Sequence, residues 1–279
     1  PLDHRSDLVR RFFVGEGFLE ARSVAFVPEI RSARDRVALL RPLSRAESFL
    51  RTDLTPVLLG RLEHNWLRGR RSVRLFEVGT AFGRRNPRPS APPTDPSPED
   101  RDAASPFVEE RRFAFVFTGD RTPVHWSGSS PEADLWDLKG VIEQLAETFD
   151  LGPVAPFAGR EDGCLPRFGW ETWLDTEAYE VGEGDRLAGI AGRVKPQALD
   201  APPWAAPVFA GEFRLDAVQT KDHRSFEPLA QYPAVARDLA FTLAASVPAS
   251  EVQAAIRHAA PPLLSSLQLF DVYEGEGVA

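Results

Sequence analysis

The sequence has 279 residues, of which 43% are hydrophobic and 27% charged, an ordinary composition for one large or two average-sized soluble globular domains. Its single cysteine, Cys164, excludes an intrachain disulfide and a cysteine-based zinc site, and its apolar runs are shorter than the ~18–20 residues that cross a membrane. The net charge of −8 is uneven, because residues 1–88 hold 18 arginines against 10 acidic residues. This excess fits a coding bias, since the chain has 30 arginines and 3 lysines, or an acidic or polyanionic partner.

The start of the sequence has no secretory signal, because charged residues are spread throughout residues 1–20. Together with the single cysteine, this predicts a cytoplasmic protein. The sequence begins at Pro1 and contains no methionine, so we expect it to be part of a longer chain.

Hydrophobic periodicity predicts a mixture of helices and strands over the first 215 residues. In chain order it predicts a helix over residues 3–14, a strand over 23–27, a helix over 54–67, strands over 73–82 and 113–118, a helix over 134–149, and strands over 170–174, 187–194 and 208–215. The clearest helix is the one over 134–149, where apolar residues lie on one face and Asp134 is a suitable N-cap.

Two stretches interrupt this pattern. Residues 86–106 contain seven prolines and no apolar residue larger than alanine, which predicts a long loop without a core of its own. Residues 216–231 are polar and predict a linker. The linker is followed by a predicted strand over 237–243, a helix over 248–259 and a strand over 267–273, which is half of a ferredoxin-like split β-α-β fold.

The sequence shows no motif of a catalytic or metal centre. The five histidines share no metal-ligand spacing, and the two Gly-Glu-Gly segments lack the strand and helix context of a phosphate-binding loop. We therefore expect no metal ligand and no catalytic residue in this chain.

One segment, Tyr232-Pro-Ala-Val-Ala-Arg-Asp-Leu-Ala-Phe241, has two interpretations. Its Arg237-Asp238 pair fits a structural role in fixing the start of the predicted strand. It equally fits an arginine offered to an RNA phosphate, because such contacts position a protein on nucleic acid.

This segment resembles the opening of the anticodon-binding domain of phenylalanyl-tRNA synthetase β subunits, where Tyr-Pro is followed by Arg-Asp-Leu-Ala. Leu269-Phe-Asp-Val-Tyr-Glu-Gly275 resembles the second strand of the same domain. Four upstream motifs resemble the same subunit in the same order: Leu50-Arg-Thr-Asp-Leu-Thr-Pro-Val-Leu-Leu59, Arg74-Leu-Phe-Glu-Val-Gly79, Asp137-Leu-Lys-Gly140 and Phe213-Arg-Leu-Asp216.

The resemblance covers nearly the whole chain and implies an α+β fold in two domains. Residues 1–221 would form a class II synthetase-like antiparallel sheet flanked by helices, and residues 222–279 a truncated ferredoxin-like anticodon-binding domain. The opening helix, with Leu8, Phe12 and Phe13, would pack against the catalytic α subunit in an (αβ)₂ enzyme. The whole enzyme would need ATP and Mg²⁺, and this segment would bind no cofactor.

The implied function is that of a non-catalytic segment of phenylalanine–tRNA ligase, with Arg237 and Tyr232 as candidates to contact tRNA(Phe). An active class II synthetase needs a motif 3 arginine in a glycine-rich strand that leads into a helix. In this chain Arg193 is followed by Pro196, where that helix should run, which favours the inactive form.

Two alternatives stay open at this point. The first is a stand-alone paralogue that binds RNA or protein. The second is a free-standing class II-like enzyme that activates a small amino acid. The missing motif 3 argues against the enzyme, and ATP-dependent pyrophosphate exchange by this chain alone would support it.

Overall fold

The fold is taken from a computed structural model of the chain, Pro1–Ala279. The structure describes residues 2–28, 36–84, 106–122, 125, 126, 128, 130–157, 173–219, 233–260 and 264–273. The chain divides into two compact units, Pro1–Arg224 and Ser225–Ala279. No helix in the described residues is long and apolar enough to cross a membrane.

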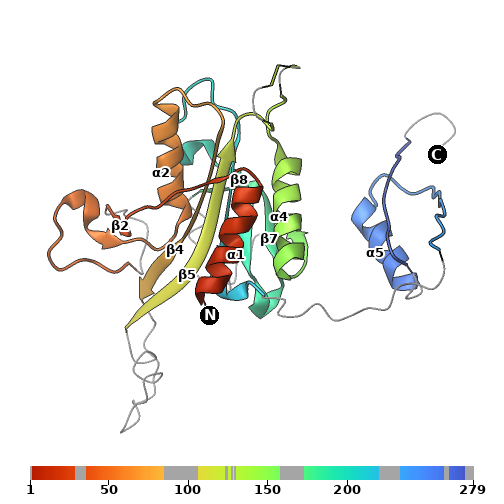
Figure 1. The fold of residues 1–279 in the computed structure, drawn as a ribbon, viewed down its shortest axis with the longest axis horizontal. Coiled ribbons are helices and arrows are strands. Elements are labelled where there is room, and N and C mark those ends of the chain that lie inside the picture. Colours follow the sequence, from red (N-terminus) through yellow and green to blue (C-terminus); the bar gives the residue numbers. More distant parts are fainter. Residues whose placement is uncertain are drawn as a thin grey trace, which may run out of the picture. The chain divides into compact units, whose positions relative to one another are not determined.

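The first unit is built on a seven-stranded sheet in the order β1-β4-β5-β9-β8-β7-β6 (Figure 1). Every neighbouring pair is antiparallel except β1 and β4, which are parallel. The strands are β1 (Leu19–Glu20), β4 (Val73–Arg84), β5 (Phe107–Thr118), β6 (Val154–Pro156), β7 (Leu174–Val181), β8 (Gly189–Val194) and β9 (Val208–Arg214). Of the strand predicted over residues 23–27, only β2 (Phe26–Val27) forms. It pairs with β3 (Phe49–Leu50) in a separate two-stranded sheet.

Helices α1 (Leu2–Gly15) and α4 (Leu135–Phe149) cover one face of the sheet, and α2 (Thr55–Trp66) covers the other. All three were predicted. Asp134 caps α4 as expected, because its side chain accepts hydrogen bonds from the backbone N–H groups of Trp136 and Asp137 at 2.8 and 3.1 Å. The Asp137 carboxylate in turn accepts from the Asp134 N–H at 2.8 Å, which completes a capping box.

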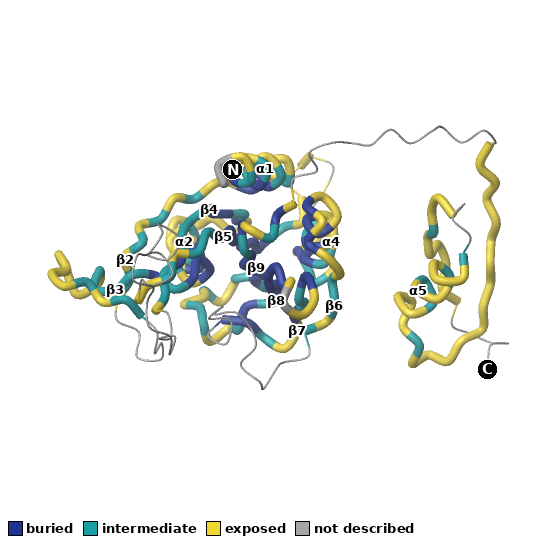
Figure 2. The backbone as a smooth tube through the Cα atoms, turned by 90° about the horizontal axis from the view of Figure 1, so that it is seen from below, coloured by how far each residue is buried: buried dark blue, intermediate teal, exposed yellow. Residues whose placement is uncertain are grey.

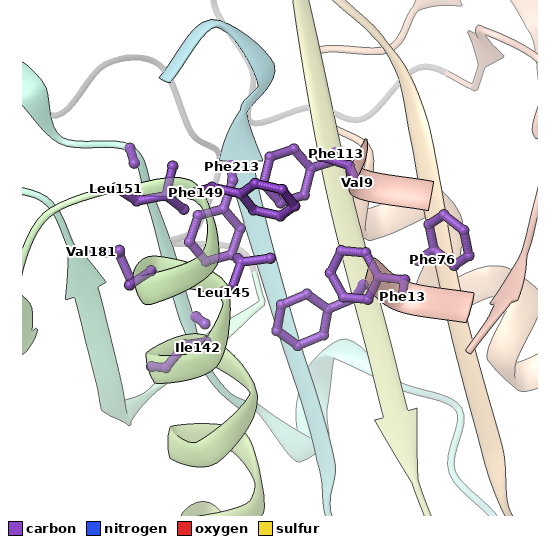
Figure 3. Packing of buried hydrophobic residues seen from close by; sticks show 14 of the residues in the cluster. Val9, Phe13, Phe76, Phe113, Ile142, Leu145, Phe149, Leu151, Val181 and Phe213 are labelled. Carbon is purple, nitrogen blue, oxygen red and sulfur yellow. The ribbon is translucent and has the colours of Figure 1, made fainter. Parts of the chain in front are cut away.

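The face under α1 and α4 is filled mainly by phenylalanine. Because successive side chains of a strand point to opposite faces, Phe113, Phe115 and Phe117 of β5 all lie in the core on the side of these two helices. Figure 3 shows Phe113 there. Phe113 stacks on Phe213 of β9 with ring centroids 5.3 Å apart, and Phe115 lies 5.4 Å from Phe13 of α1. The contact of Phe13 packs α1 on the sheet, and Phe12 of α1 in turn contacts Phe149 of α4, with ring centroids 5.7 Å apart.

The face under α2 uses smaller residues at the intervening positions. Ala114 and Val116 of β5 and Ala210 of β9 are buried there together with Leu58, Leu62 and Trp66 of α2. Figure 2 shows the buried residues concentrated where the helices meet the sheet.

Five further strands differ clearly from the prediction: β1 and β3, which were not predicted, and β5, β7 and β6. β5 begins at Phe107 and not at residue 113, and it pairs with β4 over twelve residues. Residues 109–112 at its start are charged, so this part of the strand gives no hydrophobic signal. β7 runs over Leu174–Val181 and not over the predicted 170–174, because it is buried on both faces. Leu174 and Ala178 lie in the core under α2 and Val181 lies in the core under α1 and α4, so no single face shows an apolar alternation. The short strand β6 was not predicted.

In the second unit, α5 (Ala249–Ala259) confirms the predicted helix. The segments predicted as strands, 237–243 and 267–273, form no strand in the described residues, and most of their side chains are exposed. In a split β-α-β fold the two strands of one unit are separated in the sheet by a strand from a second unit, so they do not pair with each other. The two segments therefore remain without a strand partner in the described residues.

Candidate partner and nucleic-acid interfaces

The three candidate partner residues of the opening helix differ in exposure. Phe13 is fully buried, and its ring stacks on Phe76 of β4 with centroids 5.1 Å apart (Figure 3). Phe12 is half-buried and lies 5.7 Å from Phe149 of α4, and Leu8 is half-buried against the same core. Phe13 thus holds α1 on its own sheet, while Leu8 and Phe12 keep part of their surface outside.

The outer side of α1 is the part that a partner chain can reach. His4, Asp7, Arg11 and Val14 are exposed at helical spacing, and Val14 exposes 62% of its surface. Leu19, just after the helix, exposes 70%. This stripe gives α1 an apolar end next to charged residues, a composition that suits a protein interface.

A buried ion network lies at the start of α2, and sequence reasoning missed it. Glu212 of β9 is 1% exposed, and its carboxylate accepts hydrogen bonds from the backbone N–H groups of Leu54 and Thr55 at 3.0 and 2.9 Å. The Thr55 hydroxyl also donates to it, at 2.8 Å. A helix N-terminus attracts anions, and here the chain's own carboxylate takes that position.

Arg112 of β5 neutralises this carboxylate. Its Nη1 lies 3.0 Å from Glu212 Oε1 and 3.2 Å from Asp53 Oδ1, and Glu110 pairs with the same guanidinium. Burial alone would lower the pKa of Arg112, but the carboxylates of Glu212, Glu110 and Asp53 raise it above its ordinary value. The guanidinium is therefore charged and held inside the chain.

A second buried pair lies beside the first. Arg51 Nη1 is 2.7 Å from Glu77 Oε1, and Arg51 Nε donates to the carbonyl oxygen of Thr80 at 2.9 Å. Gly79 makes room for this guanidinium, because a Cβ at that position would collide with Arg51 Nη2. Sequence reasoning placed Arg51 and Glu77 in family-like motifs and gave them no role.

Arg193, the poor motif 3 candidate, lies on β8 and pairs with Glu177 of β7 at 3.2 Å, with both side chains substantially exposed. Only a three-residue 3-10 turn, Pro196–Ala198, follows the strand, and no helix begins there. Among the residues that the structure describes, no group of three or more His, Cys, Asp or Glu side chains could hold a metal ion.

In the second unit Arg237 is exposed, and in the described part of the chain it forms no ion pair with its neighbour Asp238. The other RNA-binding candidate, Tyr232, lies outside the described residues. The structure thus leaves the Arg237 guanidinium open to solvent.

Comparison with protein families assigns both units. A model described as the phenylalanyl tRNA synthetase beta chain CLM domain matches residues 1–215, which is the sheet unit with its buried ion network. The chain belongs to the phenylalanyl-tRNA synthetase beta chain family. A second model, described as the ferredoxin-fold anticodon binding domain, matches residues 230–279.

Curated members of this synthetase family are similar over nearly the whole chain. The phenylalanine–tRNA ligase beta subunit of Mannheimia succiniciproducens is 32% identical over 284 residues, which covers 99% of this chain and 33% of the relative. Those of Salinibacter ruber and Streptomyces avermitilis are 31% and 32% identical over 85% and 96% of this chain, and 27% and 34% of the relatives. The chain therefore spans about a third of the length of the beta subunits it matches.

Proposed function

We propose that this chain is a non-catalytic segment of a phenylalanine–tRNA ligase β subunit that supports the catalytic α subunit and contacts tRNA(Phe) during ATP-dependent aminoacylation. The observation that carries the proposal is the order of the two family matches, a synthetase beta-chain domain followed by an anticodon-binding domain. The first domain, residues 1–221, takes a class II synthetase-like fold, and the second, residues 222–279, a truncated ferredoxin-like fold. ATP and Mg²⁺ are bound by the α subunit of a cytoplasmic (αβ)₂ enzyme.

The buried ion network supports a non-catalytic role for this sheet. A nucleotide site needs arginines that reach phosphate groups from the surface. Arg51 and Arg112 instead lie under α2 with side chains 5% and 3% exposed, and each is paired with carboxylates of the same chain. These charges hold the fold together and are not available to a substrate.

The scaffold contact is assigned to the outer side of α1, flanked by Leu8 and Phe12. The test is size-exclusion chromatography of this chain mixed with the cognate α subunit, for the unchanged chain and for Val14→Arg. We expect the unchanged chain to co-elute in a larger complex and Val14→Arg to weaken it, because a charge would be buried in an apolar contact. Glu147→Arg, on the exposed side of α4, is the matched control and should co-elute normally.

A substitution of Phe13 is unsuitable for this test, because it would disturb the core of the chain itself. If the unchanged, folded chain elutes separately from the α subunit, the scaffold role is wrong for this segment. A stand-alone binding protein would then be the better interpretation.

The RNA contact is assigned to the second unit through Arg237. Fluorescence anisotropy with labelled tRNA(Phe) should show weaker binding for Arg237→Gln, because loss of one phosphate contact reduces affinity for any RNA sequence. Arg257→Gln, exposed on α5, removes the same charge from the same unit and serves as the control. Equal effects of the two substitutions would contradict a specific role for Arg237.

A further inference from the structure

The turn between α2 and β4 carries three exposed arginines within four residues: Arg68, Arg70 and Arg71. No ion pair of theirs is found within the described part of the chain. They contrast with Arg51 and Arg112 of the same unit, which are buried and paired with carboxylates. Three guanidinium groups at one place, none with an ion pair in the described residues, require an explanation that the fold alone does not give.

The backbone holds this turn in a fixed shape. Gly69 has a φ of +75°, and its N–H donates to the carbonyl oxygen of Trp66 at 2.8 Å. The N–H of Arg70 donates to the carbonyl oxygen of Asn65 at 3.1 Å. These two bonds are those of a Schellman motif, which ends a helix in a defined geometry. The arginine Cα positions are therefore set before any partner arrives.

Arg71 is also fixed by a ring. Its Cζ lies 5.1 Å from the centroid of the Trp204 ring, and Trp204 meets Trp66 edge-on at 6.5 Å. Trp66 is 4% exposed and anchors this stack to the core under α2. A guanidinium on an aromatic face keeps its N–H groups directed outward, and little conformational entropy is lost when it then binds a phosphate.

Three carboxylates between the end of β5 and the first turn of α4 already have partners in the chain. Asp120 accepts a hydrogen bond from Ser72 at 3.0 Å, and Asp134 and Asp137 lie 3.1 and 2.7 Å from Arg121. In Figure 1 the α2–β4 turn, the segment that follows β5 and the segment before β9 lie at the same end of the sheet. These carboxylates are therefore not paired with the three arginines, which keep their positive charge at this end of the sheet.

A purely structural role accounts for only part of the cluster. A cation close to a helix C-terminus stabilises the helix through its dipole, and the effect falls off beyond the last turn. This explains Arg68, which directly follows Leu67, the C-cap residue of α2. It does not explain Arg70 and Arg71, which lie beyond the Schellman turn on the way to β4.

We propose that Arg68, Arg70 and Arg71 bind the phosphate backbone of RNA, as a contact separate from that of the anticodon-binding unit. This inference rests on the proposed contact with tRNA(Phe). Two tryptophans at this end of the sheet favour RNA over an acidic protein, because exposed aromatic rings stack on nucleic-acid bases. Trp204 is 37% exposed and Trp126, in the segment after β5, is 91% exposed.

The test measures binding of labelled tRNA(Phe) by fluorescence anisotropy at a series of salt concentrations. The test variant is the triple substitution Arg68→Gln, Arg70→Gln and Arg71→Gln. The control removes the same three charges from other exposed sites of the first unit, by Arg41→Gln, Arg45→Gln and Arg186→Gln. Arg237→Gln reports separately on the contact of the second unit.

We expect the test variant to lose about tenfold or more in affinity at low salt, and the slope of log affinity against log salt to fall by about 2 to 3. The control should keep the slope of the unchanged chain. Because Arg71 contacts Trp204, Arg70→Glu is a second variant, which leaves that ring contact intact and should weaken binding on its own. Unfolding in urea checks that each variant is folded.

If Arg237→Gln weakens binding while the triple variant and Arg70→Glu do not, the inference is wrong and the proposed function stands. If the unchanged chain does not bind tRNA(Phe), the RNA contact of the proposed function fails together with the inference. If the triple variant binds tRNA normally and loses the α subunit, the surface is a protein interface, which also overturns the inference.

Discussion

Replacing Glu212 by glutamine should destabilise the first unit strongly, although the change removes only a charge and keeps the side-chain shape. The Glu212 carboxylate accepts from two backbone N–H groups and the Thr55 hydroxyl, and it faces Arg112 at 3.0 Å. A glutamine amide has one accepting oxygen, so its NH₂ group must point at either the start of α2 or the guanidinium, both of which are donors. At least one buried donor is then left without an acceptor.

The expected loss is about 3 kcal/mol. Breaking a buried ion pair by removing one partner costs about 3–5 kcal/mol, and Asp53 and Glu110 still neutralise part of the Arg112 charge. With a denaturant slope of about 2 kcal/mol per molar urea, the unfolding midpoint should fall by about 1.5 M. This is a large share of the ~5–15 kcal/mol by which domains are stable.

Tryptophan fluorescence is the suitable probe, because all six tryptophans of the chain lie in the first unit. Glu177→Gln is the matched control: it breaks the exposed pair with Arg193 and should change the free energy of unfolding by less than about 0.5 kcal/mol. If Glu212→Gln and Glu177→Gln shift the urea midpoint equally, the buried network does not hold α2 on the sheet, and the reasoning is refuted.

Two further predictions concern the packing and charge of the same unit. Gly79→Ala should destabilise by about 1–3 kcal/mol, because its Cβ would displace Arg51, whereas Gly140→Ala in α4 meets no atom within 4 Å and should stabilise by about 0.5–1 kcal/mol; urea unfolding measures both, and equal signs would contradict the steric argument. For Asp134, burial raises the pKa, but hydrogen bonds from the N–H groups of Asp137 and Trp136 and the charge of Arg121 outweigh it and lower the pKa. The stability from this depressed pKa is present above the unfolded pKa and is lost as pH falls through the folded value, so Asp134→Asn should be less stable at neutral pH and approach the unchanged chain below about pH 4. A difference in unfolding free energy that does not vary with pH would contradict this.

Local patterns in the sequence were enough to predict the helices. The α4 helix combines one apolar face with Asp134 at the capping position, and both signals lie within sixteen residues. The first part of β5, residues 107–111, was missed because it pairs with β4 outside the hydrophobic core. Its residues are mostly charged and show no alternation of polarity. β7 was misplaced because its buried residues are divided between the two faces of the sheet, which hides the alternation of polarity.

The buried network could not be predicted from local patterns. Glu212 and the start of α2 are 158 residues apart in the chain, and nothing near either one indicates the other. Phe13 illustrates the same limit at the predicted interface, since helical spacing shows that a residue belongs to an apolar face but not which chain covers that face. The three turn arginines were visible only as part of a general excess over residues 1–88.

The position of β9 has a consequence for how the chain is made. β9 is the last strand of the sheet to leave the ribosome, yet it lies in its middle, between the half formed by β1, β4 and β5 and the half formed by β8, β7 and β6. Until β9 emerges, each half has an open edge, the phenylalanines of β5 lack their partners Phe209 and Phe213, and α2 lacks the Glu212 carboxylate. An open edge invites wrong strand pairing, so the nascent chain is exposed to aggregation until one late strand joins the two halves.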